Sequence, residues 1–269
     1  MPERSLNILV VGATGSIGRP VVAEALARGH SVKALVRDTR KGRTLGSSVN
    51  LVLGDLTEEA SVQMAVRDVD AIVFTHGSNG GGKAGSERVD YGGVRNVLAA
   101  LGPQRARIAL MTAIGVTNRT GSYNRSTEAH DWKRRGERLV RASGLPYTIV
   151  RPGWFDYNDA DQQKLVFLQG DTRQSGTPSD GVIARRLIAQ VLVASLTSEA
   201  ARNKTFELVA EKGPAQHDLD PLFATLAADK TGGPDAVRDI DNMPLRDEPE
   251  RVLGDLDAIR AQGTTELSF

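Results

Sequence analysis

Short aliphatic runs alternate with longer amphipathic segments over the first part of the chain, up to about residue 155. Each run predicts a buried strand, and the 3.6-residue period between runs predicts helices. Strands that alternate with helices predict an α/β fold: a doubly wound, mostly parallel sheet with helices on both faces. The predicted strands are Leu6–Val11, Ser31–Val36, Val49–Leu53, Val69–Thr75, Arg107–Thr112 and Tyr147–Val150. The predicted helices are Ser16–Arg28, Glu58–Arg67, Ser86–Leu101 and Glu128–Ser143.

The alternation stops beyond Trp154. A polar stretch with a short apolar patch at Lys164–Leu168 precedes a predicted helix and a last strand, and Pro and Gly interrupt the remainder. We therefore expect one domain over 1–212, with substrate-side segments 154–181 and 197–212. The remainder, 213–269, is expected to be a tail packed on the domain or a partly mobile lid. The later predicted elements are helices Val182–Leu196, Asp218–Ala228 and Glu248–Ala261 and the strand Thr205–Val209.

Three glycines at regular spacing follow the first predicted strand and open the first helix. Gly12 permits a tight turn, Gly15 lets a pyrophosphate approach the backbone, and Gly18 lets helix and strand pack closely. Free N–H groups and the helix dipole at this point favour an anion. The pattern predicts a dinucleotide-binding, Rossmann-type domain, although a glycine turn kept only for packing is the alternative. The expected contacts are Gly12, Thr14, Gly15, Ser16, Ile17 and Gly18.

Several motifs together resemble the atypical short-chain dehydrogenase/reductases, in the NmrA-like and flavin-reductase-like branch of NAD(P)-binding proteins. The resemblance covers about residues 6–209. Its motifs are VVGATGSIGRPVV, the GDL at Gly54–Leu56, VDYGGVRNVLAAL at Val89–Leu101, LMTAIGV at Leu110–Val116, WKRRGERLVRASGLPYTIVRPGWF at Trp132–Phe155, and IARRLIAQVLVASL followed by TFEL.

The resemblance implies further cofactor contacts at the carboxyl ends of the predicted strands. It puts Asp55 and Leu56 near the adenine, and Thr75, His76 and Gly77 near the second ribose and the nicotinamide. Pro152 and Gly153 would lie beside the nicotinamide. Trp154 and Phe155 would line the pocket, or belong to the core. The loop at His76–Gly85 holds five glycines and is expected to be flexible.

Arg37, at the end of the second strand, bears on the choice between NAD and NADP. An acid at this position would bind the ribose 2′-OH of NAD, whereas an arginine pairs with the 2′-phosphate of NADP. We expect NADP in preference to NAD, although Arg37 as a solvated charge is the alternative. Asp38 would either orient Arg37 or point to solvent.

The catalytic pair of the resembled family, Tyr-x-x-x-Lys, is incomplete in this chain. Lys133 occupies the lysine position, but Ala129 stands four residues earlier where tyrosine is expected. The candidates for chemistry or cofactor contact are Lys133, Thr112 and His130. The resemblance implies that Lys133 contacts the cofactor ribose; a solvated helix lysine is the alternative. Thr112 would supply the hydroxyl that the family has at the end of strand five, or it would bond only its own backbone. His130 would donate a proton, or it would be a surface histidine. Tyr123 could reach the site only from a loop, and Arg134 and Arg135 are expected to be solvated.

Composition removes several classes of function. The net charge of +1 gives no basic field for nucleic acid or a membrane surface, and no apolar run is long enough to span a membrane. Cysteine is absent and the four histidines are dispersed, so no metal site is expected. The apolar stretch at the N-terminus is too short for a signal peptide, and we expect a cytoplasmic protein that acts on a small molecule. A homodimer stays open.

Two functions follow from these residues. The first is an NADP(H)-dependent oxidoreductase that reduces a quinone, flavin, activated alkene or carbonyl without the usual tyrosine. The second is a non-catalytic NADP-binding redox sensor or regulatory protein. An epimerase or dehydratase is less favoured, because those reactions depend on the tyrosine.

Overall fold

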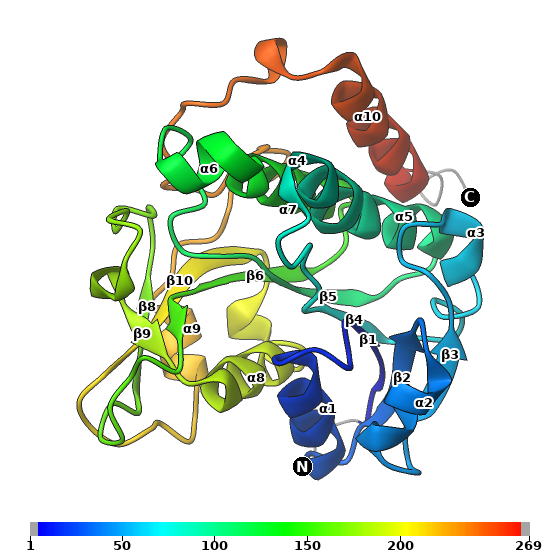
Figure 1. Ribbon diagram of the computed structural model, residues 1–269, viewed down its shortest axis with the longest axis horizontal. Helices are drawn as coiled ribbons and strands as arrows, with labels where there is room; N and C mark the ends of the chain where they lie inside the picture. Colours follow the sequence, from blue (N-terminus) through cyan, green and yellow to red (C-terminus); the bar gives the residue numbers. More distant parts are fainter. Residues whose placement is uncertain (1–4, 265–269) are drawn as a thin grey trace.

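One open, mostly parallel sheet with helices on both faces forms the protein (Figure 1). The computed structural model describes residues 5–264. Residues 1–4, before the first predicted strand, and 265–269, at the end of the predicted tail, lie outside this range. The strand order is β3-β2-β1-β4-β5-β6-β10-β9-β7, with β8 paired to β10. The strands are β1 Asn7–Val11, β2 Ser31–Val36, β3 Asn50–Leu53, β4 Ala71–Phe74, β5 Arg107–Met111, β6 Tyr147–Pro152, β7 Trp154–Phe155, β8 Lys164–Leu168, β9 Val182–Ile183 and β10 Lys204–Glu211.

The path from β3 to β10 is parallel throughout, and β8 and β9 run antiparallel to β10. The predicted doubly wound parallel sheet is therefore confirmed. The helices are α1 Gly18–Ala27, α2 Thr39–Gly42, α3 Glu59–Val62, α4 Gly82–Gly85, α5 Gly92–Leu101, α6 Ser122–Thr127, α7 Ala129–Ala142, α8 Arg185–Ala194, α9 Asp220–Ala224 and α10 Glu250–Thr264, with a π-helical turn at Ser86–Tyr91 and 3-10 turns at Arg43–Leu45, Pro178–Asp180, Glu199–Ala201 and Leu245–Asp247.

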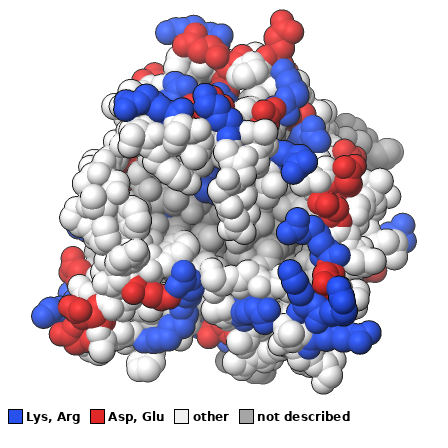
Figure 2. Space-filling model, viewed as in Figure 1, with Lys and Arg blue, Asp and Glu red and all other residues white. Residues whose placement is uncertain are grey.

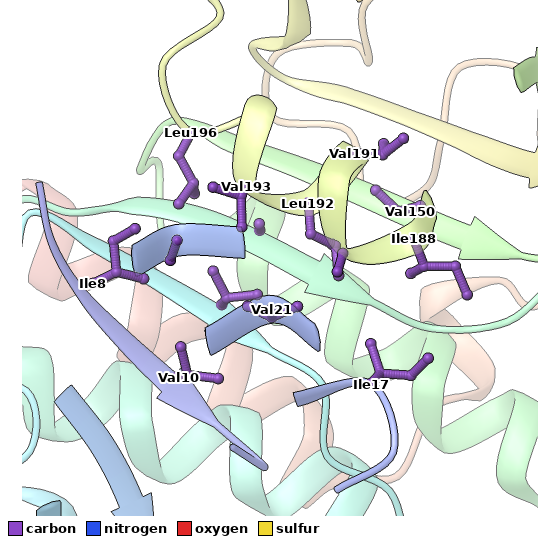
Figure 3. Packing of buried hydrophobic residues seen from close by; sticks show 14 of the residues in the cluster. Ile8, Val10, Ile17, Val21, Val150, Ile188, Val191, Leu192, Val193 and Leu196 are labelled. Atoms are coloured by element: carbon purple, nitrogen blue, oxygen red, sulfur yellow. The ribbon is translucent and has the colours of Figure 1, made fainter. Parts of the chain in front are cut away.

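The side chains of β1 divide between two hydrophobic cores, one on each face of the sheet. Ile8 and Val10 pack with α1 and α8 (Figure 3), whereas Leu9 and Val11 pack with α5, α7 and α10. Alternation along a strand sends neighbouring side chains to opposite faces, so an all-aliphatic strand needs cover on both. The two cores fix β1 and the turn that follows it.

Several predicted boundaries differ from the structure. The helix expected over Glu58–Arg67 ends at Val62, and the one expected over Asp218–Ala228 spans only α9. The helix expected from Val182 begins at Arg185, because Val182 pairs with β10. The apolar patch Lys164–Leu168 is a strand, β8. The last four residues of the glycine loop form α4, and the helix expected over Ser86–Leu101 opens with the π-helical turn.

Residues after β10 are fixed to the domain by buried ion pairs. Five arginines of α7 and β6 meet acids of this segment, all at N–O distances below 3.2 Å. The prediction that Arg134 and Arg135 are solvated is wrong, since only 0% and 8% of their surfaces are exposed. A charge run on a helix does not reveal that acids distant in sequence cover it. The pairs are Arg134–Asp235, Arg135–Glu248, Arg138–Asp235, Arg138–Glu248, Arg141–Asp229 and Arg151–Asp239.

Within residues 5–264, none of the helices is both long and apolar enough to cross a membrane.

Candidate functional site

The residues expected to bind a cofactor gather at one edge of the sheet. They follow the carboxyl ends of β1, β2, β3, β4, β5 and β6, which a parallel sheet brings to the same side. We call this side the carboxyl edge. Figure 2 shows the molecule hollowed near the centre of the face that Figure 1 presents. The topology thus brings together segments that are up to about 140 residues apart, from Gly12 to Gly153.

The glycine turn after β1 has the geometry that a bound pyrophosphate needs. Gly12 has a φ of +87°, and a Cβ on it would lie 2.8 Å from the backbone nitrogen of His76. A Cβ on Gly18 would lie 2.1 Å from Gly12 O, so α1 packs directly on the turn. Gly15 and Ser16 are exposed, whereas Ile17 is 3% exposed and belongs to the core under α1.

A dinucleotide fits this turn for a reason independent of sequence motifs. The first N–H groups of α1, around Ser16 to Gly18, have no intrahelical acceptor and lie beside the exposed Gly15. Side chains at positions 12 or 18 would collide with backbone, whereas the nearest atom to a Cβ on Gly15 is Gly12 O at 3.1 Å. Gly15 is therefore the glycine of this turn with the most open space beside its Cα, where a ligand could approach.

Arg37 is exposed at the end of β2, and the neighbouring Asp38 is engaged with α2. Asp38 is the N-cap of α2, and its Oδ1 accepts the backbone N–H of Arg40 at 2.8 Å. The capping role answers which way Asp38 points: it neither pairs with Arg37 nor is free in solvent. Figure 2 shows Lys and Arg side chains gathered where Figure 1 has α2.

The segment after β3 is held by short-range hydrogen bonds. Asp55 Oδ1 accepts both the N–H and the hydroxyl of Thr57 at 2.9 Å. The bond from the Thr57 N–H is the main cause that keeps the pKa of Asp55 below its usual value, and Arg37 adds to it. The backbone oxygen of Leu56 accepts Asn96 Nδ2 at 2.9 Å. Asp55 is therefore ionised and within the electrostatic reach of Arg37 at the carboxyl edge.

The residues after β4 direct their side chains inward. The Thr75 hydroxyl donates to Val11 O at 3.0 Å, which ties β4 to β1. His76 is half-buried, and burial of its ring lowers its pKa to about 4, so the imidazole is neutral. A Cβ on Gly93 would lie 3.1 Å from His76 Nε2, which places the ring against α5. Because the side chains of Thr75 and His76 point inward, a cofactor at this position would meet mainly the backbone atoms of Thr75, His76 and Gly77.

Lys133 forms an ion pair with Asp90 beside this segment. Its Nζ lies 2.6 Å from Asp90 Oδ1, and the Asp90 side chain is only 1% exposed. Asp90 Oδ2 accepts the Ser78 hydroxyl at 2.8 Å. Asp90 therefore links the glycine loop after β4 to Lys133 on α7. A lysine ammonium has three donors, so this pair leaves two of them for a ligand.

Thr112 donates its hydroxyl to Glu137, at 2.8 Å, and not to its own backbone. Glu137 is fully buried and accepts two bonds from the Arg151 guanidinium, at 3.0 and 2.7 Å. Burial alone would raise the pKa of Glu137, but the charges of Arg151 and Arg141 outweigh it and lower that pKa. Thr112 is 5% exposed, and its proton is engaged with a carboxylate.

A cavity of about 610 Å³ opens at the carboxyl edge beyond β5 and β6. We call it the edge cavity; its lining includes Ile114, Tyr123, His130, Trp154, Phe155 and Asp180. The backbone turn Pro152–Gly153 forms part of its wall.

Tyr123 and His130 lie together at this cavity. Their ring centroids are 5.3 Å apart, and His130 Nδ1 lies 3.4 Å from Asn118 O. Burial lowers the pKa of His130, so this histidine is neutral near pH 7. Ala129, at the position of the missing tyrosine, is 2% exposed and brings no polar group to replace a phenol.

The model of a family described as NAD(P)H-binding matches residues 12–199, about two thirds of the chain. The chain belongs to this family. The match runs from the glycine turn to the 3-10 turn that follows α8, and it includes every residue that the sequence assigned to the cofactor. It agrees with the resemblance to atypical short-chain dehydrogenase/reductases.

Relatives in the NAD(P)H-binding family carry different named functions. The chain is 28% identical over 225 residues to photosystem II assembly factor Ycf39 of Cyanophora paradoxa, covering 82% of this chain and 69% of that protein. It is 24% identical over 265 residues to sanguinarine reductase of Eschscholzia californica, covering 82% and 96%. A solved NAD-dependent epimerase/dehydratase-like structure from Bacillus halodurans matches with a TM-score of 0.67 at 24% identity, covering 82% and 100%.

Three acids at the carboxyl edge and the edge cavity are not predicted from the sequence: Asp90, Glu137 and Asp180. Asp90 could have been found, because it lies on the helical face of Gly93 and Val97, where an acid needs a buried partner. Glu137 and Asp180 gave no comparable signal. Glu137 lies among other charged residues of a helix. Asp180 lies in a polar segment without the hydrophobic periodicity that would predict its structure.

Proposed function

We propose that this protein is an NADP(H)-dependent oxidoreductase that reduces a small substrate without a catalytic tyrosine. The observation that carries the proposal is the edge cavity, which opens between the Lys133 helix and the turn Pro152–Phe155. A protein that only reads the redox state of a nucleotide has no need of a cavity that continues from the turn Pro152–Phe155 to Tyr123 and Asp180. The cavity supports a substrate, and the family match supports the dinucleotide.

The preference for NADP over NAD is supported by the surroundings of Arg37. Its guanidinium is exposed at the carboxyl end of β2, and Asp38 is engaged as the α2 cap. Asp38 is thus held at α2 through its Oδ1, whereas an arginine can pair with a 2′-phosphate in two-point fashion. Exposed basic side chains of α2, such as Arg40, add positive potential there.

NADPH supplies a hydride when it is bound, and the residues of this chain position it and the acceptor. The turn at Gly12–Gly18 would hold the pyrophosphate, and Lys133, oriented by Asp90, would donate to ribose hydroxyls. With Ala129 in place of tyrosine, the chain favours acceptors whose reduced form takes its proton from water. Quinones, flavins and activated alkenes meet this condition better than simple carbonyls.

A non-catalytic NADP-binding regulator is the second candidate. It is favoured by Ala129, and by the likeness to a protein named as an assembly factor. NADPH oxidation by the purified protein with quinones, flavins and aldehydes separates the two. Turnover above background supports the reductase, whereas micromolar NADPH binding without turnover supports the regulator.

A further inference from the structure

The edge cavity carries a charge pattern that limits what it can bind. Of the thirteen residues that line it in the described part of the chain, Asp180 is the only acid, and Lys and Arg do not occur. Three nearby cations are already paired: Lys133 with Asp90, Arg119 with Asp131, and Arg185, whose guanidinium lies 5.3 Å from the Phe155 ring, with Asp156. A fourth, Arg173, is exposed outside the lining, and its Nη1 lies 3.6 Å from the position of a Cβ on Gly181.

Asp180 is a fixed negative charge on this lining. Its carboxylate accepts the backbone N–H groups of Ser175 and Gly176 at 2.7 and 2.8 Å. Burial alone would raise the pKa of Asp180, but these hydrogen bonds outweigh it and keep that pKa below its usual value. The carboxyl group is therefore ionised at neutral pH, and it opposes a second negative charge in the cavity.

Aromatic rings reach the cavity from three separate elements. Tyr123 and His130 come from α6 and α7, and Trp154 and Phe155 from β7. Trp154 also packs edge-on against Tyr157, at 6.0 Å between ring centroids, which supports its orientation. Tyr123, Trp154 and Tyr157 keep 57%, 36% and 64% of their surfaces exposed, an unusual amount for large apolar rings. Such faces favour a flat ring as ligand.

We infer that the edge cavity binds a planar aromatic molecule without negative charge, and that anionic analogues are rejected. The inference rests on the proposed function only in taking this cavity as the substrate site. Aromatics that carry a carboxylate, sulfonate or phosphate on the ring itself would meet Asp180 and find no lining cation to pair with. An uncharged ring stacks on the aromatic side chains without this electrostatic repulsion. A cationic ring is in addition attracted by the Asp180 carboxylate and by the faces of the aromatic side chains.

Binding of three probes to the protein saturated with NADP⁺ tests the inference. The probes are 1,4-naphthoquinone, its anionic 2-sulfonate, and cationic N-methylquinolinium; the quinones have no cysteine to alkylate, because the chain has none. Fluorescence quenching in Trp132→Phe reports on Trp154 alone, since the chain has two tryptophans. We expect the sulfonate to bind about tenfold more weakly than the naphthoquinone, and the cation at least as tightly.

Two charge variants make the test specific to the cavity. Asp180→Asn should reduce the ratio between the dissociation constants of the sulfonate and the naphthoquinone. Tyr123→Arg, a change at an exposed position of the lining, adds a cation to the cavity. It should reduce or reverse the same ratio of dissociation constants. Met64→Arg adds the same charge at an exposed position of the molecule outside the cavity lining and should change nothing.

Equal or tighter binding of the sulfonate to the unmodified cavity overturns the inference, as does failure of both uncharged and cationic probes to bind. NADPH oxidation measured in parallel keeps the proposed function separate. Selective binding without turnover supports the cavity assignment and contradicts the reductase. Equal turnover of naphthoquinone and its sulfonate supports the reductase and contradicts the charge selectivity.

Discussion

Lys133 and Asp90 form an ion pair at the carboxyl edge, with 2.6 Å between Nζ and Oδ1. The pair joins α7 to the turn before α5, and the Ser78 hydroxyl on the other carboxylate oxygen extends it to the loop after β4. Lys133 is therefore oriented without the tyrosine that usually accompanies it. In the proposed function Lys133 would act as a positioned donor, and not as a group that lowers the pKa of a phenol.

Lys133→Ala should weaken NADPH binding about tenfold or more, because hydrogen bonds from a charged donor to the ribose are lost. Titration of the variant with NADPH, followed by nucleotide fluorescence, measures this. Lys212→Ala removes an exposed lysine paired with Asp161 and serves as the control. An unchanged dissociation constant in Lys133→Ala would dismiss the ribose contact.

Arg37→Glu should weaken NADP⁺ binding by at least about tenfold and leave NAD⁺ binding nearly unchanged. The new carboxylate repels a 2′-phosphate but can accept a 2′-OH. Calorimetric titration with both nucleotides measures the two constants. Arg67→Glu makes the same charge change at an exposed residue outside the carboxyl edge. Equal losses for NADP⁺ and NAD⁺ would show that Arg37 is not at the phosphate.

Gly15→Ala and Gly18→Ala should separate binding from folding within one turn. A Cβ at position 15 would lie 3.1 Å from Gly12 O, a close contact, and would project where the pyrophosphate would approach, so affinity should fall with a smaller loss of Tm than at position 18. At position 18 the Cβ would lie 2.1 Å from Gly12 O, so Tm should fall by several degrees. Thermal unfolding and NADPH titration of both variants measure this. A Gly15→Ala protein that binds NADPH normally would contradict the assignment.

Glu207→Gln should change how stability depends on pH. Burial raises the pKa of Glu207 to about 7 from 4.5, so the folded protein holds a proton that the unfolded chain loses between these values. This group's stabilisation is thus present below pH 4.5 and lost as pH rises to about 7, a loss of roughly 3 kcal/mol. Glutamine mimics the protonated acid and should remove the loss.

Urea unfolding of wild type and Glu207→Gln at pH 5 and pH 8 gives the comparison. The variant should gain stability relative to wild type at pH 8, while contributions from His76 cancel in the difference. Glu211→Gln, an exposed acid at the end of the same strand, is the control. A stability difference that is equal at both pH values would show that Glu207 does not titrate in this range.

The sequence allowed the sheet and the glycine turn to be predicted because both depend on local patterns. Aliphatic runs such as Ile8–Val11 fix a strand, and Gly12, Gly15 and Gly18 fix a turn at its end. Parallel strands then bring the candidate residues after β1 to β6 to one edge without further information.

Partners distant in sequence could not be predicted in the same way. Arg134 and Arg138 look like solvent-facing charges of a helix until Asp235 and Glu248 cover them. The pairing of Thr112 with Glu137 likewise depends on how α7 packs on β5. A single sequence contains the charges but not the contacts, so the expectation of a solvated Arg134 was wrong for a physical reason.

Single-turnover oxidation of NADPH under anaerobic conditions, with 1,4-naphthoquinone as acceptor, tests whether the protein is a reductase or only binds the nucleotide. NADPH carrying deuterium on one or the other face of C4 makes the experiment stereospecific, because a fixed cofactor presents one face to the edge cavity. The account predicts rapid oxidation that slows with deuterium on one face and is unaffected by deuterium on the other. NADPH that binds but is oxidised no faster than in buffer, or without an isotope effect from either face, would contradict it.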